Sequence, residues 1–370
     1  MKILFLTNNL CGGGAERVLV NLANSLVERN YDVTVRALIN AGENKSLLSS
    51  KVKYEYILKK AFRGINFLHV LPHKWIYNKV AYGEFDIVVV YLHGVLTKIV
   101  SYAPETQKTV AYLHANMEKS AFIDSFGGKE NIRKCFNTYN RIVAVSEDVK
   151  ESFINVSDIT DKRLVVKYNT FDVERIQKLA AESFESRFEN KKGLSVCTVG
   201  NLKEVKGHKR LLSVVKKLKE DGMPVQLTIV GGGSLKEELQ AYINDNELRE
   251  YATLIGFDVN PYKYVAKSDL FVCSSYSEGF SSVVAESLFL GVPVVTTDCA
   301  GMRELLGSNN EFGVIVSNDE EGLYKGISNM VKNPECLEKY RLAALERGKL
   351  FDTENTVSAV EEMFKEIMNE

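Results

Sequence analysis

Residues 2–26 read KILFLTNNLCGGGAERVLVNLANSL, an apolar run followed by a glycine-rich turn and a longer segment with spaced apolar residues. Apolar side chains between Val18 and Val27 recur at positions i, i+3, i+4 and i+7, which is the spacing of a helix that packs one face on a sheet. The run Lys2–Thr7 is typical of a strand. Strand, turn and helix in this order predict the beginning of a parallel α/β sheet.

The same order of strand and helix continues along the chain and then starts again. We interpret the polar stretch Glu174–Lys192 as a linker between the two series. Strand-like runs lie at 33–39, 85–91, 109–114 and 141–146 in the first series, and at 194–199, 226–230, 252–255, 270–273, 292–296 and 314–316 in the second. We predict two Rossmann-like, doubly wound parallel-sheet domains, 1–175 and 190–350, that face a cleft with their strand-end loops. Residues 351–370 are expected to form a C-terminal helix that returns to the first domain.

The composition is that of a globular chain. It is 370 residues long, 45% hydrophobic, and carries a formal net charge of -1. No apolar run approaches the ~20 residues of a membrane span, and no signal-peptide pattern is present, so we expect a cytoplasmic protein. The six cysteines form no CxxC pair, which argues against a zinc site or a disulfide framework. Residues 1–120 hold 15 Lys and Arg against 9 Asp and Glu, a balance that favours an anionic acceptor or surface, or marks only a solvated face.

The glycines at 12–14 lie between a strand and a helix, where backbone amides point at whatever occupies the end of the sheet. They favour close approach of a phosphate or a sugar, and a purely structural tight turn is the alternative. Arg17 stands where the third glycine of a dinucleotide fingerprint belongs, so a nicotinamide-dependent dehydrogenase is disfavoured.

The stretch 277–286, SEGFSSVVAE, also follows a strand and enters a helix. The amides at the beginning of that helix suit a pyrophosphate. Glu286 lies in an otherwise apolar helix, where an unpaired carboxylate is costly, so it needs a partner. Paired ribose hydroxyls would serve, and an ion pair with Arg303 or a capping contact is the alternative.

Glu278 and Glu286, with seven residues between them, resemble the signature of retaining glycosyltransferases of the GT-B fold, family four. The resemblance covers nearly the whole chain, and its motifs stand in the family's order. They are GGGAERVLVNLANSL near the N-terminus, IVAVSE at 142–147, VKYNTFD at 166–172, VGNLKEVKGH at 199–208, GFDVNPY at 256–262 and GVPVVTTDCAGMRELL at 291–306.

The resemblance implies roles for particular residues. Glu286 would bind the donor ribose, Glu278 would lie against the transferred sugar, and Lys206 would neutralise the pyrophosphate. His114, at the end of a strand in VAYLHANM, is similar to the family's active-site histidine, although a strand-end histidine can also cap a loop. Further donor contacts would come from Gly13, Gly14, Gly279, Phe280, Ser281, Ser282 and Val283.

Two positions weaken or extend this assignment. Members commonly have an arginine where Asn201 stands, so one phosphate-binding cation is missing, and Lys203 is a candidate substitute. His93 ends a strand in VVYLHG and is a secondary candidate on the acceptor side.

The segment 59–79 holds five Lys and Arg without an acidic residue, interleaved with aromatic and aliphatic side chains. This composition suits an anionic membrane surface. A helix that packs its apolar stripe on the sheet is an equal alternative.

Together with these features, the resemblance implies a retaining, metal-independent hexosyl- or N-acetylhexosaminyl-transferase. It would move a sugar from a nucleoside diphosphate sugar, with UDP as the expected nucleotide, to a hydroxyl of a glycan or lipid-linked acceptor in polysaccharide or glycoconjugate synthesis. No cofactor, metal or nucleic acid is expected. The rivals are a sugar-nucleotide epimerase of related fold and a non-catalytic partner subunit of another glycosyltransferase.

Overall fold

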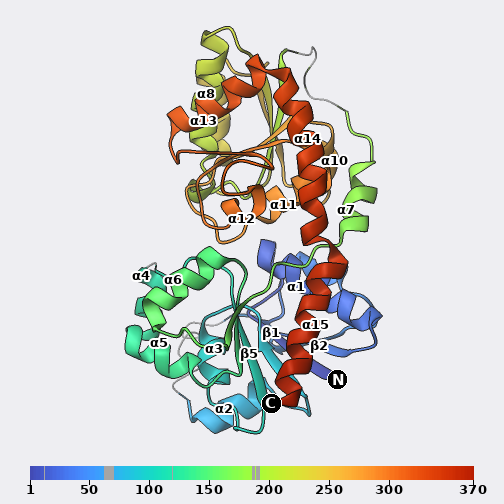
Figure 1. Cartoon of the computed structure of the whole chain (residues 1–370), viewed down its shortest axis with the longest axis vertical. Coiled ribbons are helices and arrows are strands. Elements are labelled where there is room, and N and C mark those ends of the chain that lie inside the picture. The colour runs from blue at the N-terminus through green and yellow to red at the C-terminus, as the bar shows by residue number, and fades with distance from the viewer. Residues whose placement is uncertain (12, 62–70, 119, 186–187, 189–191) are drawn as a thin grey trace. The chain divides into compact units, whose positions relative to one another are not determined.

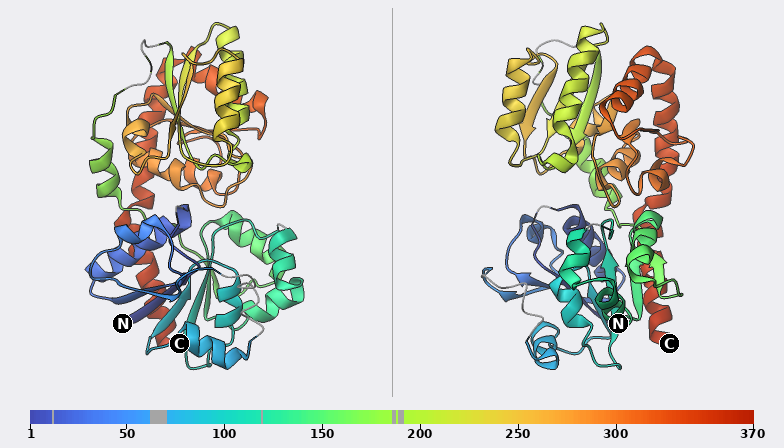
Figure 2. Two further views of the ribbon diagram at one scale, coloured as in Figure 1. Left: turned by 180° about the vertical axis from the view of Figure 1, so that it is seen from behind. Right: turned by 90° about the vertical axis from the view of Figure 1, so that its left-hand side faces the viewer.

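The computed structural model describes residues 1–11, 13–61, 71–118, 120–185, 188 and 192–370. The chain forms two compact units, one of Met1–Phe171 with Asp352–Glu370 and the other of Asp172–Phe351. Each unit is a parallel sheet with helices on both faces, as Figures 1 and 2 show. This is the predicted doubly wound α/β architecture.

The first unit contains a seven-stranded sheet in the order β3-β2-β1-β4-β5-β6-β7. The strands are β1 (Lys2–Thr7), β2 (Asp32–Ile39), β3 (Lys53–Leu58), β4 (Ile87–Val90), β5 (Lys108–Leu113), β6 (Arg141–Ala144) and β7 (Leu164–Val166). The described helices are α1 (Gly14–Glu28), α2 (His73–Val80), α3 (Val95–Val100), α4 (Ser120–Phe126), α5 (Lys129–Phe136), α6 (Glu147–Ser157) and α15 (Thr353–Asn369), with a short 3-10 helix η1 (Glu43–Leu47). The strand order reverses between β1 and β4, and such a switch point is where α/β sheets bind ligands.

The second unit contains a six-stranded sheet in the order β10-β9-β8-β11-β12-β13. The strands are β8 (Leu194–Val199), β9 (Val225–Val230), β10 (Ala252–Gly256), β11 (Leu270–Cys273), β12 (Val294–Thr297) and β13 (Val314–Val316). The helices are α7 (Val173–Ala180), α8 (His208–Glu220), α9 (Lys236–Asp245), α10 (Tyr262–Ala266), α11 (Ser282–Phe289), α12 (Met302–Leu306), α13 (Glu320–Lys332) and α14 (Pro334–Gly348), with 3-10 helices η3 (Glu204–Lys206) and η4 (Lys349–Phe351). Its switch point lies between β8 and β11.

The buried apolar runs explain why these strands form. The four residues of β4 are fully buried, as are the apolar residues of β11, because helices cover both faces of the sheet. Helix α8 buries Leu211, Leu212 and Val215 against the second sheet, at the helical spacing that the sequence predicts.

Several elements differ from the sequence-based prediction. Strand β3 was not predicted because KYEYIL is a half-buried edge strand that mixes charged and aromatic residues. The three-residue strand β7 is too short to give a pattern. Helix α7 extends into the predicted linker. Asp172 caps this helix through its side chain, and the helix packs against α10 and α11, so the linker interpretation was wrong for residues 174–180.

Helix α15 packs on α1 in the first unit. Arg29 at the end of α1 forms an ion pair with Glu354 at 2.6 Å and another with Glu361. Arg141 of β6 is 4% exposed and binds Glu370 at 2.8 Å. None of the described helices is both long enough and apolar enough to cross a bilayer.

Candidate functional site

Polar and charged side chains lie together at the switch point of the second unit. The loop after β11 runs from Ser274 to the beginning of α11, where Ser281 is the N-cap residue. The Ser281 side chain makes no capping hydrogen bond to any residue that the structure describes. The first amides of a helix have no partner within it, so the beginning of α11 can receive an anion.

Glu278 and Lys206 form an ion pair in this loop region. Lys206 Nζ donates to Glu278 Oε1 at 2.7 Å, and Ser275 Oγ donates to the same oxygen at 2.5 Å. The side chains are 26% and 11% exposed, so the pair is only partly screened by water. Burial lowers the pKa of Lys206, but the ion pair with Glu278 outweighs burial and raises the pKa overall. The two residues that the sequence assigns to phosphate and sugar therefore lie together.

Backbone contacts hold the segments of this pair in place. Tyr276 N donates to the carbonyl of Val205 at 2.8 Å, and Ser274 Oγ donates to the carbonyl of Lys206 at 3.0 Å. Gly207 has φ +65°, and a Cβ there would lie 2.1 Å from the carbonyl oxygen of Ser274. Only glycine allows these two segments to approach so closely.

Arg210 of α8 is a further part of the site that the sequence analysis missed. It is 3% exposed and donates to the carbonyls of Ser274 at 2.6 and 2.8 Å and of Ser275 at 2.7 Å. Its guanidinium lies 3.8 Å from the centroid of the Tyr276 ring. Arg210 thus fixes the backbone just before Glu278. The sequence HKRLL gives no signal of this role, because the contacts join residues that are 64 or more positions apart.

Glu286 lies on α11, eight residues after Glu278. Its carboxylate accepts a hydrogen bond of 3.2 Å from the hydroxyl of Tyr262, a buried residue of α10. Arg303, the sequence-based alternative partner, donates to Asp298 at 2.7 Å. The contact between Tyr262 and Glu286 was not predicted.

The remaining predicted donor-binding positions of this unit differ in exposure. Phe280 is 7% exposed and its ring packs on Phe351. Ser281 is 2% exposed, whereas Ser282 and Val283 are half-buried at the beginning of α11. Asn201 and Lys203 are exposed in the loop after β8.

Two histidines lie at the carboxyl ends of adjacent strands in the first unit. His93 follows β4 and His114 follows β5, and the ring of Tyr91 lies 4.8 Å from that of His114. Burial and then the neighbouring His93 lower the pKa of His114 to about 3, and burial lowers the pKa of His93. Both imidazoles are therefore neutral at pH 7. Within the described part of the chain, His93 Nδ1 and His114 Nε2 are buried without a hydrogen-bond partner, which leaves them for a ligand.

The glycine-rich turn of the same unit contains a carboxylate. Gly13 is the N-cap of α1, which begins at Gly14, and Gly12 lies outside the described residues. A Cβ on Gly13 would lie 2.0 Å from the Glu16 carboxylate, so this acidic group already covers the turn. Burial raises the pKa of Glu16. An approaching phosphate would have to displace this side chain.

Comparison with known proteins gives two family matches that together cover most of the chain. Residues 12–175 match the family described as Glycosyltransferase Family 4, and residues 180–347 match Glycosyl transferases group 1.

Individual relatives agree with these matches. An N-acetylgalactosamine-N,N'-diacetylbacillosaminyl-diphospho-undecaprenol 4-alpha-N-acetylgalactosaminyltransferase of Campylobacter jejuni is 38% identical over 208 residues, which is 56% of this chain and 53% of that protein. An uncharacterized glycosyltransferase of Methanocaldococcus jannaschii is 33% identical over 47% of this chain and 44% of its own length. The matched region is thus about half of each of these two relatives. An uncharacterized glycosyltransferase of Haemophilus influenzae is 24% identical over 98% of both chains.

Solved structures show the same fold. The Anabaena protein Alr3699/HepE in complex with UDP-glucose has a TM-score of 0.77 at 20% identity, covering 99% of this chain and 100% of that one. A glycosyltransferase from Rickettsia africae has a TM-score of 0.80 at 17% identity, covering 99% and 98%. The predicted GT-B fold is confirmed.

Proposed function

We propose that this chain, which belongs to the family 4 and group 1 glycosyltransferases, transfers a sugar from a nucleoside diphosphate sugar to a hydroxyl group of a glycan or lipid-linked acceptor. The observation that carries the proposal is the Lys206–Glu278 ion pair beside the beginning of α11. It combines a cation, a carboxylate and unpaired helix amides at the switch point of a parallel sheet.

The proposed donor is a UDP-sugar. The Anabaena structures hold UDP and UDP-glucose, which supports uridine as the base. The proposed acceptor is a lipid-linked glycan, because the name of the Campylobacter relative specifies a diphospho-undecaprenol acceptor. Glu286, positioned by Tyr262, would accept hydrogen bonds from the two ribose hydroxyls.

The proposed reaction retains the anomeric configuration. The acceptor oxygen attacks the anomeric carbon as the bond to the pyrophosphate breaks, and the departing phosphate oxygen takes the acceptor proton. The α11 amides and Lys206 stabilise the negative charge that develops on the leaving group. For this step Lys206 exchanges part of its bond with Glu278 for the phosphate, and Glu278 then accepts hydrogen bonds from the sugar.

His114 is proposed to contact the transferred sugar as a hydrogen-bonding group. Because its pKa is about 3, its imidazole is neutral at pH 7: its one N–H can donate a hydrogen bond, but the side chain does not act as a general acid. His93 is proposed as a secondary contact on the acceptor side.

Transfer is proposed to need no metal ion, since Lys206 and the α11 amides already offset the pyrophosphate charge. Activity that is lost with a chelator and restored by magnesium or manganese contradicts this part of the proposal.

The enzyme is further proposed to bind the membrane peripherally through the segment 59–79. Within this segment residues 62–70, with Phe62, Arg63 and Phe67, lie outside the described residues. Helix α2 buries Ile76, Tyr77 and Val80, which is the predicted apolar stripe, and at the same time leaves Trp75 52% exposed. The buried side chains of α2 agree with the helix interpretation, and the exposed Trp75 supports the proposed contact with a membrane surface.

The proposed function is tested by incubating the purified chain with UDP-, GDP- and ADP-sugars and measuring the release of nucleoside diphosphate. We expect release from UDP-sugars, faster with acceptor, and a loss of rate in Lys206→Gln. Lys209→Gln is the matched control, because Lys209 is an exposed neighbour that pairs with Glu238. Binding of UDP without release from any donor indicates a non-catalytic subunit, and conversion of one UDP-sugar to another indicates an epimerase.

A further inference from the structure

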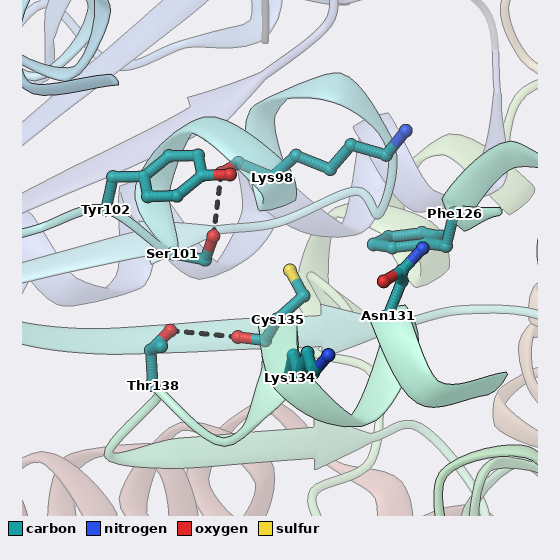
Figure 3. A pocket seen from close by; sticks show the side chains of 8 residues that line it. All are labelled: Lys98, Ser101, Tyr102, Phe126, Asn131, Lys134, Cys135 and Thr138. Atoms are coloured by element: carbon teal, nitrogen blue, oxygen red, sulfur yellow. Dashed lines mark hydrogen bonds between the residues drawn. The ribbon is translucent and has the colours of Figure 1, made fainter. Parts of the chain in front are cut away.

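A pocket of about 480 Å³ lies on the first unit between α3 and the helices α4 and α5 (Figure 3). We call it the α3–α5 pocket. Its lining includes Lys98 and Ser101 at the end of α3, Phe126 of α4, and Lys134 and Cys135 of α5. The site described above does not use any of these residues.

The pocket is separate from the carboxyl edge of the sheet, where His93 lies. Helix α3 begins just after Gly94 and leads away from that edge. At about 1.5 Å per residue, Lys98 and Ser101 lie about 6 and 10 Å further along the helix axis.

The charged groups that line the pocket are both cations. Lys98 and Lys134 contribute ammonium groups, and no Asp or Glu is among the described lining residues. Lys98 Nζ donates to the carbonyl of Ser125 and lies 5.1 Å from the centroid of the Phe126 ring. An ammonium group has three donors, so this carbonyl leaves capacity for an anion.

Two other groups, the Glu130 partner of Lys134 and the Cys135 thiol, leave the positive charge of the pocket largely in place. Lys134 pairs with Glu130 at 2.6 Å, but the side chains of this pair are 69% and 79% exposed, and such pairs exchange readily for another anion. Burial raises the pKa of the Cys135 thiol to about 11, so the thiol adds no negative charge.

The rim of the pocket continues into helix α2. The ring of Tyr102 stacks on that of His73, with centroids 3.6 Å apart and planes 7° apart. Tyr102 is 41% exposed and Trp75, two residues after His73, is 52% exposed. Lys74 and Lys79 of α2 are also exposed, and α2 contains no acidic residue. Exposed Trp and Tyr beside cations are typical of a surface at the lipid head-group level.

We propose that the α3–α5 pocket binds the phosphate of an anionic phospholipid head group through Lys98 and Lys134, while Trp75 enters the interface beside it. This inference extends the membrane surface proposed above and is independent of glycosyl transfer. If the pocket binds a phosphate, the docking surface should prefer phosphate head groups to other anions, whereas a surface that acts only through its charge should not.

The test compares two kinds of vesicle of equal negative charge, in which phosphatidylcholine is mixed with phosphatidylglycerol or with oleate. Trp75 is the only tryptophan, so its fluorescence reports binding without a label. We expect wild-type protein to bind the phosphate vesicles several-fold more tightly than the carboxylate vesicles. Lys98→Gln/Lys134→Gln is expected to lose this preference, whereas Lys332→Gln/Lys339→Gln, the same charge change at exposed positions of the second unit, keeps it.

Further arms keep the outcome decisive. Lys98→Arg/Lys134→Arg keeps both cations and is expected to keep the preference, which separates the role of the cations from a folding defect. Glycerol 3-phosphate is expected to compete with phosphate vesicles better than glycerol with matched sodium chloride does. Equal binding of the wild type to both kinds of vesicle contradicts phosphate binding in the α3–α5 pocket but agrees with the proposed membrane surface. A preference that survives in the Lys98→Gln/Lys134→Gln variant also contradicts phosphate binding in the pocket. A lack of binding to phosphate vesicles contradicts both the pocket proposal and the membrane-surface proposal. The proposed glycosyl transfer is tested separately by the release of UDP.

Discussion

The carboxylate of Glu286 has two candidate roles that predict different results of its removal. As a ribose ligand it accepts two hydrogen bonds, which the amide of Glu286→Gln replaces poorly. We expect this variant to lose about 1–3 kcal/mol of UDP affinity with little change in melting temperature. Calorimetric titration with UDP, beside thermal unfolding of the ligand-free protein, measures both.

A control separates the ligand role from the support of the helix. Tyr262→Phe removes the hydroxyl that Glu286 binds at 3.2 Å but leaves the carboxylate in place, so we expect a smaller loss of UDP affinity. If Glu286→Gln instead lowers the melting temperature and leaves UDP affinity unchanged, Glu286 is a structural residue, and the donor-binding assignment of Gly279–Val283 is weakened with it.

The lowered pKa of His114 predicts that the free energy of unfolding depends on pH. Its pKa is about 3 in the folded protein against 6.5 for an ordinary histidine, so the unfolded chain binds the proton more readily between these values. This contribution to the free energy of unfolding is therefore present above pH 6.5 and falls as the pH is lowered towards 3. In His114→Asn we expect a shallower loss of stability between pH 6.5 and 4, measured by denaturant unfolding.

His208 gives the comparison for this measurement. Its pKa is lowered to about 4, mainly by burial, so His208→Asn is also expected to make the pH dependence shallower. The two variants should differ in sugar transfer at neutral pH, because only His114 is proposed to contact the sugar. An unchanged pH dependence in His114→Asn contradicts the buried neutral state of that imidazole.

At the scale of the elements, Arg210 joins helix α8 to the loop after β11. Lysine at this position keeps the charge but lacks the planar fork that reaches the carbonyls of Ser274 and Ser275. We expect Arg210→Lys to lower the rate of transfer by about tenfold or more, because about 1.4 kcal/mol of lost positioning at Glu278 corresponds to that factor. UDP affinity should change less, since Glu286 stands on α11. Steady-state kinetics beside UDP titration tests this, with Lys209→Gln as the control, and equal losses in both readouts contradict a positioning role.

Local patterns predicted the elements better than the contacts between them. Strand β11 is buried on both faces and therefore has a continuous apolar run. Helix α8 is buried on one side and therefore has apolar residues at helical spacing, so both patterns are visible in the sequence. Strand β3 lacks such a run because it is an edge strand among the described strands of its sheet and is only half-buried. Glu278, Glu286 and Lys206 were identified through motif resemblance. Arg210 and Tyr262 were not, because their roles arise from pairs 64 and 24 positions apart that no local pattern encodes.

In the whole molecule, the chain passes between the two units twice, at Phe171 and again at Phe351. The first crossing is tied to the chain after the second, because Thr353 Oγ1 donates to the carbonyl of Phe171 at 2.6 Å. Helix α15 then buries Val357, Val360, Met363, Phe364 and Ile367 in the first unit. The first unit therefore includes helix α15, which lies far along the chain from the other elements of that unit.

Removal of residues 352–370 is expected to destabilise the first unit selectively. It exposes the apolar surface that α15 covers and leaves Arg141, which is 4% exposed, without Glu370. The loss of several buried apolar side chains is comparable with the ~5–15 kcal/mol stability of a whole domain. Scanning calorimetry should show a separate, lower transition for the first unit. The full-length variant Glu366→Gln/Glu370→Gln, which removes only charge, should shift that transition much less.

Because Lys206, Glu278 and Glu286 all belong to the second unit, the truncated chain should still bind UDP at temperatures where the first unit is unfolded. Unchanged unfolding after truncation contradicts the structural role of α15, and loss of UDP binding places essential donor contacts in the first unit instead.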